Sequence, residues 1–466
     1  MKKGSVIIYS IIILLILAAL AYWQFFLRNT STTPTTPDTT QTGFTPFGRN
    51  TTGTVAPSGN GNNDNGGVTS TTTGAKIKIP TLRLLSNTPV GGYGASTTET
   101  ITTKATKLAS STQVLGTTHI RWVDRGRGDV YEALGNTLDI TTLSNTIVPK
   151  IYESVWDKNL TSFVALTLSD QNNTINGVLA ELKNRVLPKI TAPKVSTSTK
   201  STSSSNQTPA QSQTNNTNTS SLTPYELKGK SLPDNIIGYA VSPKKDRIFM
   251  LINDNGTGVG YTSNFNGTSP VQIFTTPLIQ VNVEWPSDNV IAITTKGASD
   301  QRGFLYFVNP KTGVWNKILG PLPGLSTKVS TDAKYIFISA TGNADNIVTS
   351  IYNVATRKGT DGIIRTLADK CVWGNFYKDM VYCAVPSQPV KAVYPDDWYK
   401  GTISLIDKIW QSNATTGEIK LISSIVDTSD RVIDAFNLGL DPKDNFLIFM
   451  NKNDLSLWSL DLVSGN

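Results

Sequence analysis

A short polar turn followed by a run of consecutive apolar residues recurs along the chain. In the clearest copy, Ser242–Ile252, polar and turn-forming residues precede Ile-Phe-Met-Leu-Ile. The other copies are Trp122–Tyr131, Trp156–Ala165, Trp285–Ile293, Ser330–Ile338, Trp373–Tyr382 and Asp441–Phe449. Each copy has the pattern of a β-hairpin, because Pro, Gly, Asn and Asp favour the turn and the apolar run favours a strand.

The copies are evenly spaced. From Ser242 to Trp285, Ser330 and Trp373 the steps are 43, 45 and 43 residues. A repeat of roughly 40–50 residues with four short strands per unit is typical of β-propeller blades. The pattern therefore predicts an all-β, seven-bladed β-propeller. A β-sandwich or two unrelated β domains is the alternative, which the regular spacing disfavours.

The strand that leaves each turn is apolar at consecutive positions and not at alternate ones. Such a strand is expected to be buried on both faces, as it would be between neighbouring blades. Several units continue into a second hairpin, with turns at Asn309–Gly313 and Asn413–Gly417. Asn, Pro and Gly provide the backbone angles that such turns need.

The two ends of the globular region complement each other. Leu82–Val90 has the composition of a strand, whereas Leu455–Leu462 provides only a third strand for the last unit. We expect the N-terminal strand to complete the seventh blade and close the ring. Closure of this kind removes two open sheet edges.

Two segments interrupt the early repeats. Residues 91–117 are polar and rich in Gly and Thr, so we expect an excursion before a first blade that begins at Thr118. Lys194–Thr223 is a Ser/Thr/Asn/Gln tract between strands expected at Gly177–Leu182 and Tyr225–Leu227. It predicts a disordered insertion (about 194–223) inside the second blade, because the strand count is complete only after it.

The first 28 residues are predicted to be a cytoplasmic start and a transmembrane signal anchor. The uncharged run Val6–Leu27 is long enough to cross about 30 Å of hydrocarbon as a helix, so residues 6–27 would contact the lipid bilayer. Lys2 and Lys3 precede this run and place the N-terminus in the cytoplasm. Ala19–Ala21 leaves a cleaved signal peptide open as an alternative, although the apolar run continues past that site.

Residues 29–75 consist mainly of Thr, Ser, Asn, Gly and Pro. Such a segment cannot bury enough apolar surface to offset its chain entropy, so it is predicted to be a disordered linker. The propeller is expected to span residues 76–466. The sequence thus predicts a single-pass membrane protein, of prokaryotic type, with its propeller on the extracytoplasmic side.

The formal net charge of +8 would suit acidic partners such as anionic cell-wall polymers or lipid head groups, but we do not infer a partner from it. The chain has no cluster of Lys and Arg with interleaved aromatic residues, so nucleic acid is not expected as a partner.

The chain has two cysteines, Cys371 and Cys383. They lie symmetrically about the sixth turn, so an antiparallel pairing would place them opposite each other. An extracytoplasmic compartment permits a disulfide there, and two buried free thiols are the alternative.

Motifs that would indicate catalysis are absent from the sequence. A single histidine excludes a histidine dyad or a metal site built on several histidines. No G-x-S-x-G elbow, C-x-x-C pair, P-loop or dinucleotide-binding glycine motif occurs. We therefore predict no catalytic residue, no metal and no cofactor.

The strongest candidate for a binding site lies in Pro386–Ile403, which separates the second and third strands of the sixth unit. The residues singled out there are Tyr394, Asp396, Asp397, Trp398 and Tyr399. Aromatic rings can stack on a ligand while carboxylates accept its hydrogen bonds. The alternative is a loop that packs on its own blade, with Trp398 and Tyr399 as a plug.

A second candidate is His119 with Arg121, close to Asp124, which we place on an innermost strand near the central channel. The alternative is a satisfied polar group with a structural role.

The turn and apolar strand in Val241–Phe249 and Leu440–Phe449 resemble the repeats of TolB-type and WD-repeat-like propellers. The resemblance covers about residues 80–466. The Asp-Gly turn of TolB-type repeats and the Trp-Asp pair of WD repeats are both missing at the expected positions. The resemblance implies an interaction platform, and no catalytic residue carries over from it.

These features together predict a membrane-anchored binding or scaffolding module for a cell-envelope partner, either a protein or a polysaccharide. The alternative is a propeller hydrolase or lyase that acts on envelope glycans or peptides, with Asp396 and Asp397 as acid and base. Adjacent loop residues seldom reach the separation of about 5–9 Å that glycosidases need, so an enzyme is disfavoured. The sequence does not separate binding from a purely structural role in an envelope assembly.

Overall fold

The structure, a computed structural model, describes residues 79–105, 110–168, 175–185, 223–343 and 346–463. They belong to one compact unit that spans Lys76–Asn466. The predicted membrane segment 6–27 and linker 29–75 lie outside the described residues, as does most of the insertion predicted at 194–223. Within the described residues, no helix is both long enough and apolar enough to cross a bilayer.

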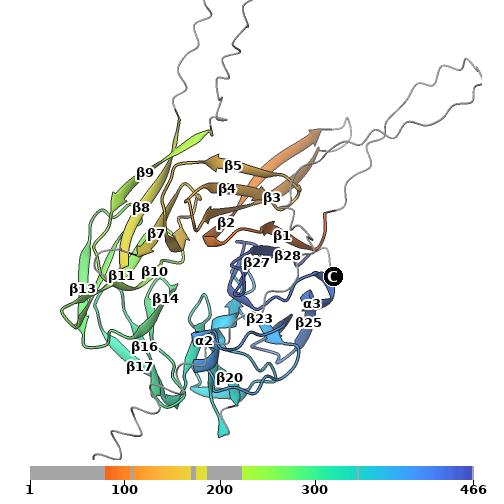
Figure 1. The fold of residues 1–466 in the computed structure, drawn as a ribbon. Coiled ribbons are helices and arrows are strands. Elements are labelled where there is room, and N and C mark those ends of the chain that lie inside the picture. The colour runs from red at the N-terminus through yellow and green to blue at the C-terminus, as the bar shows by residue number, and fades with distance from the viewer. Residues whose placement is uncertain (1–78, 106–109, 169–174, 186–222, 344–345, 464–466) are drawn as a thin grey trace, which may run out of the picture. The chain divides into compact units, whose positions relative to one another are not determined.

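The described strands form seven four-stranded antiparallel sheets arranged in a ring (Figure 1). This confirms the predicted seven-bladed propeller. Blade 1 holds β2 (Val90–Ala105), β3 (Ser110–Asp124), β4 (Val130–Leu134) and β5 (Ile140–Ser144). Blade 2 holds β6 (Ile151–Trp156), β7 (Ser162–Leu168), β8 (Ile175–Asn184) and β9 (Tyr225–Ser231). Blade 3 holds β10 (Ile236–Val241), β11 (Arg247–Asp254), β12 (Thr257–Asn264) and β13 (Val271–Thr276).

The remaining blades have the same order. Blade 4 holds β14 (Val281–Ser287), β15 (Val290–Thr295), β16 (Arg302–Val308) and β17 (Trp315–Pro323). Blade 5 holds β18 (Ser326–Val329), β19 (Tyr335–Thr341), β20 (Ile347–Asn353) and β21 (Lys358–Asp361). Blade 6 holds β22 (Cys371–Trp373), β23 (Met380–Pro386), β24 (Asp407–Asn413) and β25 (Ile419–Ser423). Blade 7 holds β26 (Ala435–Leu440), β27 (Phe446–Asn451), β28 (Leu457–Asp461) and β1 (Leu82–Ser86). The described residues also include three short helices, η3 (Ala368–Lys370), α2 (Asp396–Lys400) and α3 (Ile425–Thr428).

The ring closes as the sequence predicts. β1, the first strand of the chain, pairs antiparallel with β28, with Leu82 opposite Leu460 and Ser86 opposite Leu457. It therefore serves as the fourth strand of blade 7. Since this pairing joins the two ends of the described chain, the first and last strands share one hydrophobic core.

The second strand of each blade connects two cores, because its apolar side chains alternate between neighbouring blades. In β11, Phe249 and Leu251 pack with blade 4 residues such as Ile291, whereas Ile248 and Met250 pack with blade 2 residues such as Val164. All of these side chains are buried. Fully burying one such side chain contributes roughly 1.5–3 kcal/mol, so each of these strands holds its blade to both neighbours.

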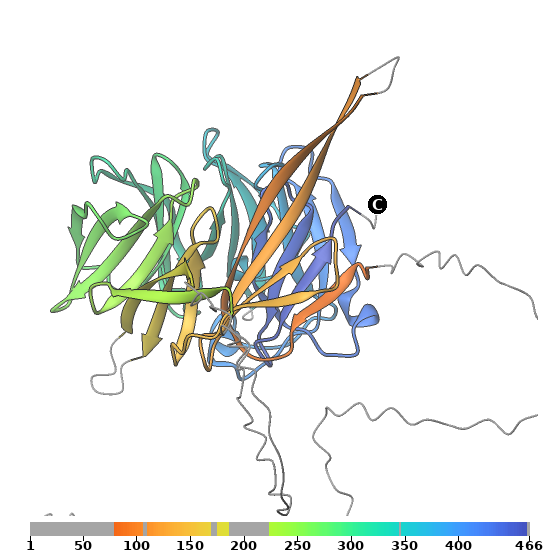
Figure 2. The ribbon, with the colours of Figure 1, turned by 90° about the horizontal axis from the view of Figure 1, so that it is seen from above.

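Blade 1 differs from the prediction. The segment 91–117 is not an excursion, since β2 and β3 pair without interruption from Gly92 opposite Val123 to Ala105 opposite Ser110. The blade thus begins at Val90 and not at Thr118. Figure 2 shows this hairpin, coloured orange to brown, projecting beyond the other strands. Threonine favours an extended backbone. The prediction from the sequence had instead interpreted the Gly- and Thr-rich composition as that of a loop.

Blade 2 agrees with the prediction at its interruption. β8 and β9 pair directly, from Asn184 opposite Tyr225 to Val178 opposite Ser231. The long segment between them therefore falls inside a blade and is not a boundary between domains.

The antiparallel order fixes the position of the loops. In each sheet, the connection from second to third strand lies at the same end as the link between blades. We call this end of the ring the insertion face, because the segment Ser387–Ile406 between β23 and β24 lies there.

Candidate functional site

The segment Ser387–Ile406, here called the insertion, folds onto the ring and carries the short helix α2 (Figure 1). Trp398 and Tyr394 are only 4% and 6% exposed. Both pack in a small core with Ile347, Leu367 and Leu405. Their burial favours the packing alternative, in which these rings support the loop and do not stack on a ligand.

The insertion contacts three other blades. The Ser299 N–H, in the connection between β15 and β16, donates to Asp396 Oδ2 at 2.7 Å. The Thr341 hydroxyl of blade 5 donates to the Tyr394 carbonyl at 2.8 Å. The indole N–H of Trp398 donates to both carboxylate oxygens of Asp434, just before β26, at 3.0 and 3.2 Å. The insertion is thus braced across blades 4, 5 and 7.

Asp396 and Asp397 are both engaged with backbone groups. Asp397 Oδ2 accepts a hydrogen bond from the Val393 N–H at 2.8 Å. Burial acts to raise the pKa of Asp396, but hydrogen bonds from Ser299 and the charge of Lys400 outweigh it and hold that pKa below its ordinary value. A general acid needs the opposite shift, so this environment does not suit Asp396 to that role.

A buried ionic cluster lies beneath α2. Lys370, Asp407 and Asp434 have side chains with no exposed surface. The Lys370 ammonium group donates to Asp407 Oδ2 at 2.8 Å, to Asp434, and to the Ala435 carbonyl at 2.9 Å. Its three N–H donors are therefore all used. Its nitrogen also lies 5.2 Å from the centre of the Trp398 ring.

The two carboxylates of this cluster are hydrogen-bonded unequally. Asp434 accepts from Trp398 and from the Leu405 N–H at 3.0 Å. Asp407 Oδ2 accepts from the Ala435 N–H at 2.7 Å, whereas its Oδ1 has no partner among the described residues. Burial raises the pKa of Asp407 to about 6, against the opposing charge of Lys370.

Tyr399 lies at the edge of the insertion, and 39% of it is exposed. Its hydroxyl donates to Asp369 Oδ2 at 2.8 Å, and the Ser326 hydroxyl donates to the same oxygen at 2.5 Å. Among the five residues predicted in this loop, only Tyr399 presents an exposed ring.

His119 and Arg121 lie on β3, the second strand of blade 1, and not on an innermost strand as expected. The reason is that β2, unrecognised in the sequence, takes the innermost position. Both side chains contact Glu132, at 3.2 Å for His119 and 2.7 Å for Arg121. His119 Nε2 also lies 3.0 Å from the Thr98 hydroxyl, and Arg121 donates to the Leu160 carbonyl at 2.7 Å. These satisfied contacts favour the structural alternative, and blade 7 separates the pair from the insertion.

Cys371 and Cys383 form the predicted disulfide, with their Cα atoms 4.1 Å apart. They pair directly across β22 and β23. The bridge is buried against Phe337 and Trp373, so it strengthens the blade that carries the insertion.

An apolar groove of about 280 Å³ lies beside the insertion, between blades 5 and 6. Its lining includes Ile347, Ile363, Val390 and Tyr394. Ile363 is 79% exposed, the largest exposed fraction among the large hydrophobic residues that the structure describes. The sequence reading missed Ile363, because one isoleucine after a turn has no distinctive pattern.

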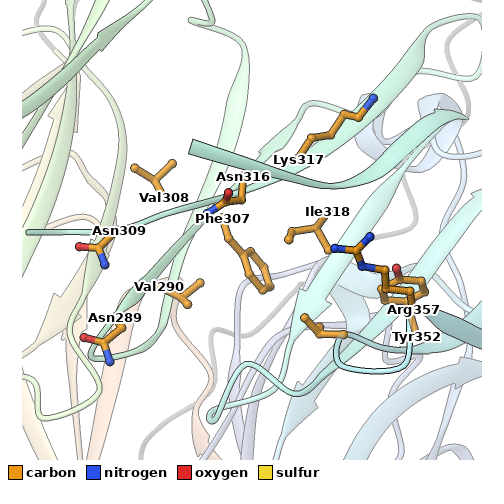
Figure 3. Close-up of a pocket in the computed structure, with 11 residues that line it drawn as sticks. Asn289, Val290, Phe307, Val308, Asn309, Asn316, Lys317, Ile318, Tyr352 and Arg357 are labelled. Carbon is orange, nitrogen blue, oxygen red and sulfur yellow. The ribbon is translucent and has the colours of Figure 1, made fainter. Parts of the chain in front are cut away.

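A larger groove of about 470 Å³ lies between blades 4 and 5. Figure 3 shows Phe307 in its middle, with Asn289 and Asn309 on one side and Tyr352 and Arg357 on the other. Asn289 and Arg357 are exposed. A third cavity, of about 400 Å³, lies among the first strands of blades 2, 3 and 4. In the part of the chain that the structure describes, no group of three or more His, Cys, Asp and Glu is placed to hold a metal ion.

The fold and these surfaces define a seven-bladed β-propeller with one braced insertion. No protein-family model matches the sequence, and no curated protein matches it. The solved structures to which the chain is similar include TolB from Acinetobacter baumannii, at 11% identity over 80% of this chain and 81% of that one, with a TM-score of 0.36. They also include a putative TolB from Agrobacterium tumefaciens, at 13% identity over 51% of this chain and 82% of that one, with a TM-score of 0.35.

A further similar structure is the β-propeller domain of the Trilobed protease from Pyrococcus furiosus. It shares 10% identity over 62% of this chain and 73% of that one, with a TM-score of 0.36. At such identities and TM-scores the comparisons do not bear on function. The assignment of the fold rests on the strand pairings described above.

Proposed function

We propose that this chain is a membrane-anchored, extracytoplasmic propeller that binds or scaffolds a partner in the cell envelope. The observation that carries the proposal is the insertion, which is braced against three other blades beside an exposed apolar groove. A preformed surface of this kind loses little conformational freedom when it binds.

The proposed location is supported by two independent features. The uncharged run Val6–Leu27 follows Lys2 and Lys3, the arrangement of a signal anchor. The Cys371–Cys383 disulfide fits an oxidising compartment outside the cytoplasm.

The groove favours a protein over a polysaccharide as the partner. Its lining is dominated by Ile347, Ile363, Val390 and neighbouring prolines, which suit an apolar side chain of a partner protein. A hydrolase or lyase built on Asp396 and Asp397 has less support, because both carboxylates already accept backbone hydrogen bonds within the propeller.

The test is capture of partners from solubilised envelope with the full-length chain and two variants. Ile363→Asp places a charge in the groove at a side chain that is 79% exposed. Val314→Asp is the matched control, because Val314 is 56% exposed and lies in the turn between β16 and β17. We expect the wild type and Val314→Asp to retain the same proteins and Ile363→Asp to lose them, while all three keep the same Tm.

Retention of the partner by Ile363→Asp would place the binding surface elsewhere. Binding to purified envelope polysaccharide and to no protein would overturn the choice of partner. Cell fractionation with and without residues 1–28 tests the anchor, since the shortened chain should leave the membrane fraction.

A further inference from the structure

The cavity of about 400 Å³ lies close to the axis of the ring. Most of its lining comes from β6, β10 and β14, which are the first strands of blades 2, 3 and 4. Figure 1 shows β10 and β14 on the inner side of their blades and β13 and β17 on the outer side. The volume falls in the range of about 300–1,000 Å³ that is usual for small-molecule sites.

Glu153 on β6 supplies a carboxylate to this cavity. Glu153 is an exposed residue that faces the cavity. The surrounding protein raises its pKa, a hydrogen bond with the Tyr239 side chain lowers it in part, and no basic group contributes. Lys296 also lines the cavity, but it does not contribute to the pKa of Glu153. A cation bound beside this carboxylate would favour its charged form, which the surrounding protein disfavours.

Two tyrosines surround this carboxylate. Tyr152 and Tyr239 line the same cavity, and the charge of Glu153 contributes to raising the pKa of both, after burial. The buried hydroxyl of Tyr239 interacts with the Glu153 carboxylate through a side-chain hydrogen bond. This contact holds the two tyrosine rings and the carboxylate together at one place in the cavity.

We propose that this cavity binds an organic cation, whose ammonium group pairs with Glu153 and packs against the rings of Tyr152 and Tyr239. A carboxylate supplies charge, and aromatic faces attract a cation through their quadrupole. The amide of Asn282 on β14 lines the same cavity and can accept a hydrogen bond from a primary ammonium group. The site does not depend on the proposed envelope function, because the groove beside Ile363 lies between other blades.

The experiment measures binding to the full-length chain by titration calorimetry. The probes are choline, a quaternary cation, and N-acetyl-lysine methylamide, a primary ammonium. N-acetyl-norleucine methylamide is the neutral control of similar shape. We expect at least one cation to bind with a Kd of about 1 mM or tighter, and the neutral control to bind at least about ten-fold more weakly. Tighter binding of the lysine derivative would indicate a peptide side chain, and tighter binding of choline would indicate a quaternary ligand.

Glu153→Gln is the decisive variant. It keeps the shape of the side chain and removes the charge, so affinity for the cations should fall about ten-fold or more. Glu418→Gln, at an exposed position in the turn before β25, is the matched control and should bind as the wild type does. The Tm of Glu153→Gln should not fall, because the amide oxygen can still accept from Tyr239 and the variant removes a charge that the surrounding protein disfavours.

A second measurement does not rely on any variant. Choline carries a permanent charge, so its affinity for the wild type should fall as the pH is lowered and Glu153 takes up a proton. The proposal is overturned if Glu153→Gln binds the cations as tightly as the wild type does. It is also overturned if the neutral control binds equally well, or if neither cation binds at up to about 10 mM.

Discussion

Replacing Lys370 by Met should destabilise the propeller strongly, and more so at high pH than at low pH. The change keeps most of the side-chain volume and removes the charge and three donors. Those donors serve Asp407, Asp434 and the Ala435 carbonyl, all in a region without exposed surface. Breaking a buried ion pair by removing one partner costs about 3–5 kcal/mol.

That free energy can be converted into a melting temperature. Unfolding entropy is about 2.1 cal/mol/K per residue, so a propeller of roughly 390 residues gives about 0.8 kcal/mol/K. The expected loss at pH 8 is then about 4–6 °C in Tm, measured by differential scanning calorimetry. Lys400→Met is the matched control, because Lys400 is 67% exposed and lies 3.9 Å from Asp396. A surface pair of this kind is worth about 0–1 kcal/mol, so its Tm should hardly change.

The pH dependence tests the mechanism. In the wild type, burial raises the pKa of Asp407 from 3.8 to about 6 even with Lys370 present. The folded state therefore binds this proton more readily than the unfolded state, and the destabilisation due to Asp407 is absent below about pH 4 and complete above about pH 6. Over that window it amounts to roughly 3 kcal/mol. Without Lys370 the pKa of Asp407 should rise further, so the deficit of the variant should shrink as the pH falls from 8 to 5. A deficit that is equal at both pH values, or no larger than that of Lys400→Met, would refute this reasoning.

Two further predictions concern the same blade and its insertion. Replacing Cys371 and Cys383 by Ser should cost about 3 kcal/mol in the chain-entropy model, and reduction of the wild type should lower the Tm to that of the double variant. Trp398→Phe keeps a ring in the core but loses both hydrogen bonds to Asp434, so we expect a loss of about 1.5–3 kcal/mol in denaturant unfolding. A Trp398→Phe variant as stable as the wild type would show that packing alone holds the insertion.

The architecture could be predicted because its signals are local and repeated. The apolar strand after each turn, such as Ile248–Leu251, has to be buried on both faces, and the spacing sets the number of blades. The disulfide followed from the symmetric positions of Cys371 and Cys383 about one turn. The start of blade 1 was missed, because a strand rich in Thr and Gly with few large apolar residues has the composition of a loop.

The site was less predictable, because its groups meet only in the folded ring. Lys370 ends η3, Asp407 begins β24 and Asp434 precedes β26. Nothing in their local sequence indicates that they share one buried cluster. Trp398 had two interpretations, because an indole ring can stack on a bound ligand or pack in a hydrophobic core. Its burial depends on Asp434, which the chain reaches 36 residues later.

The insertion is fixed in place by directional contacts more than by apolar packing. The Asp434 carboxylate is satisfied only when Lys370, Trp398 and the Leu405 N–H all point to it at once. If the insertion shifted relative to the ring, this buried carboxylate would lose hydrogen-bond partners. Each lost hydrogen bond would cost about 1–3 kcal/mol of stability. An apolar plug could slide with a much smaller change in free energy. The insertion should therefore keep one position whether or not a partner occupies the groove beside Ile363, as expected of a docking surface and not of a moving lid.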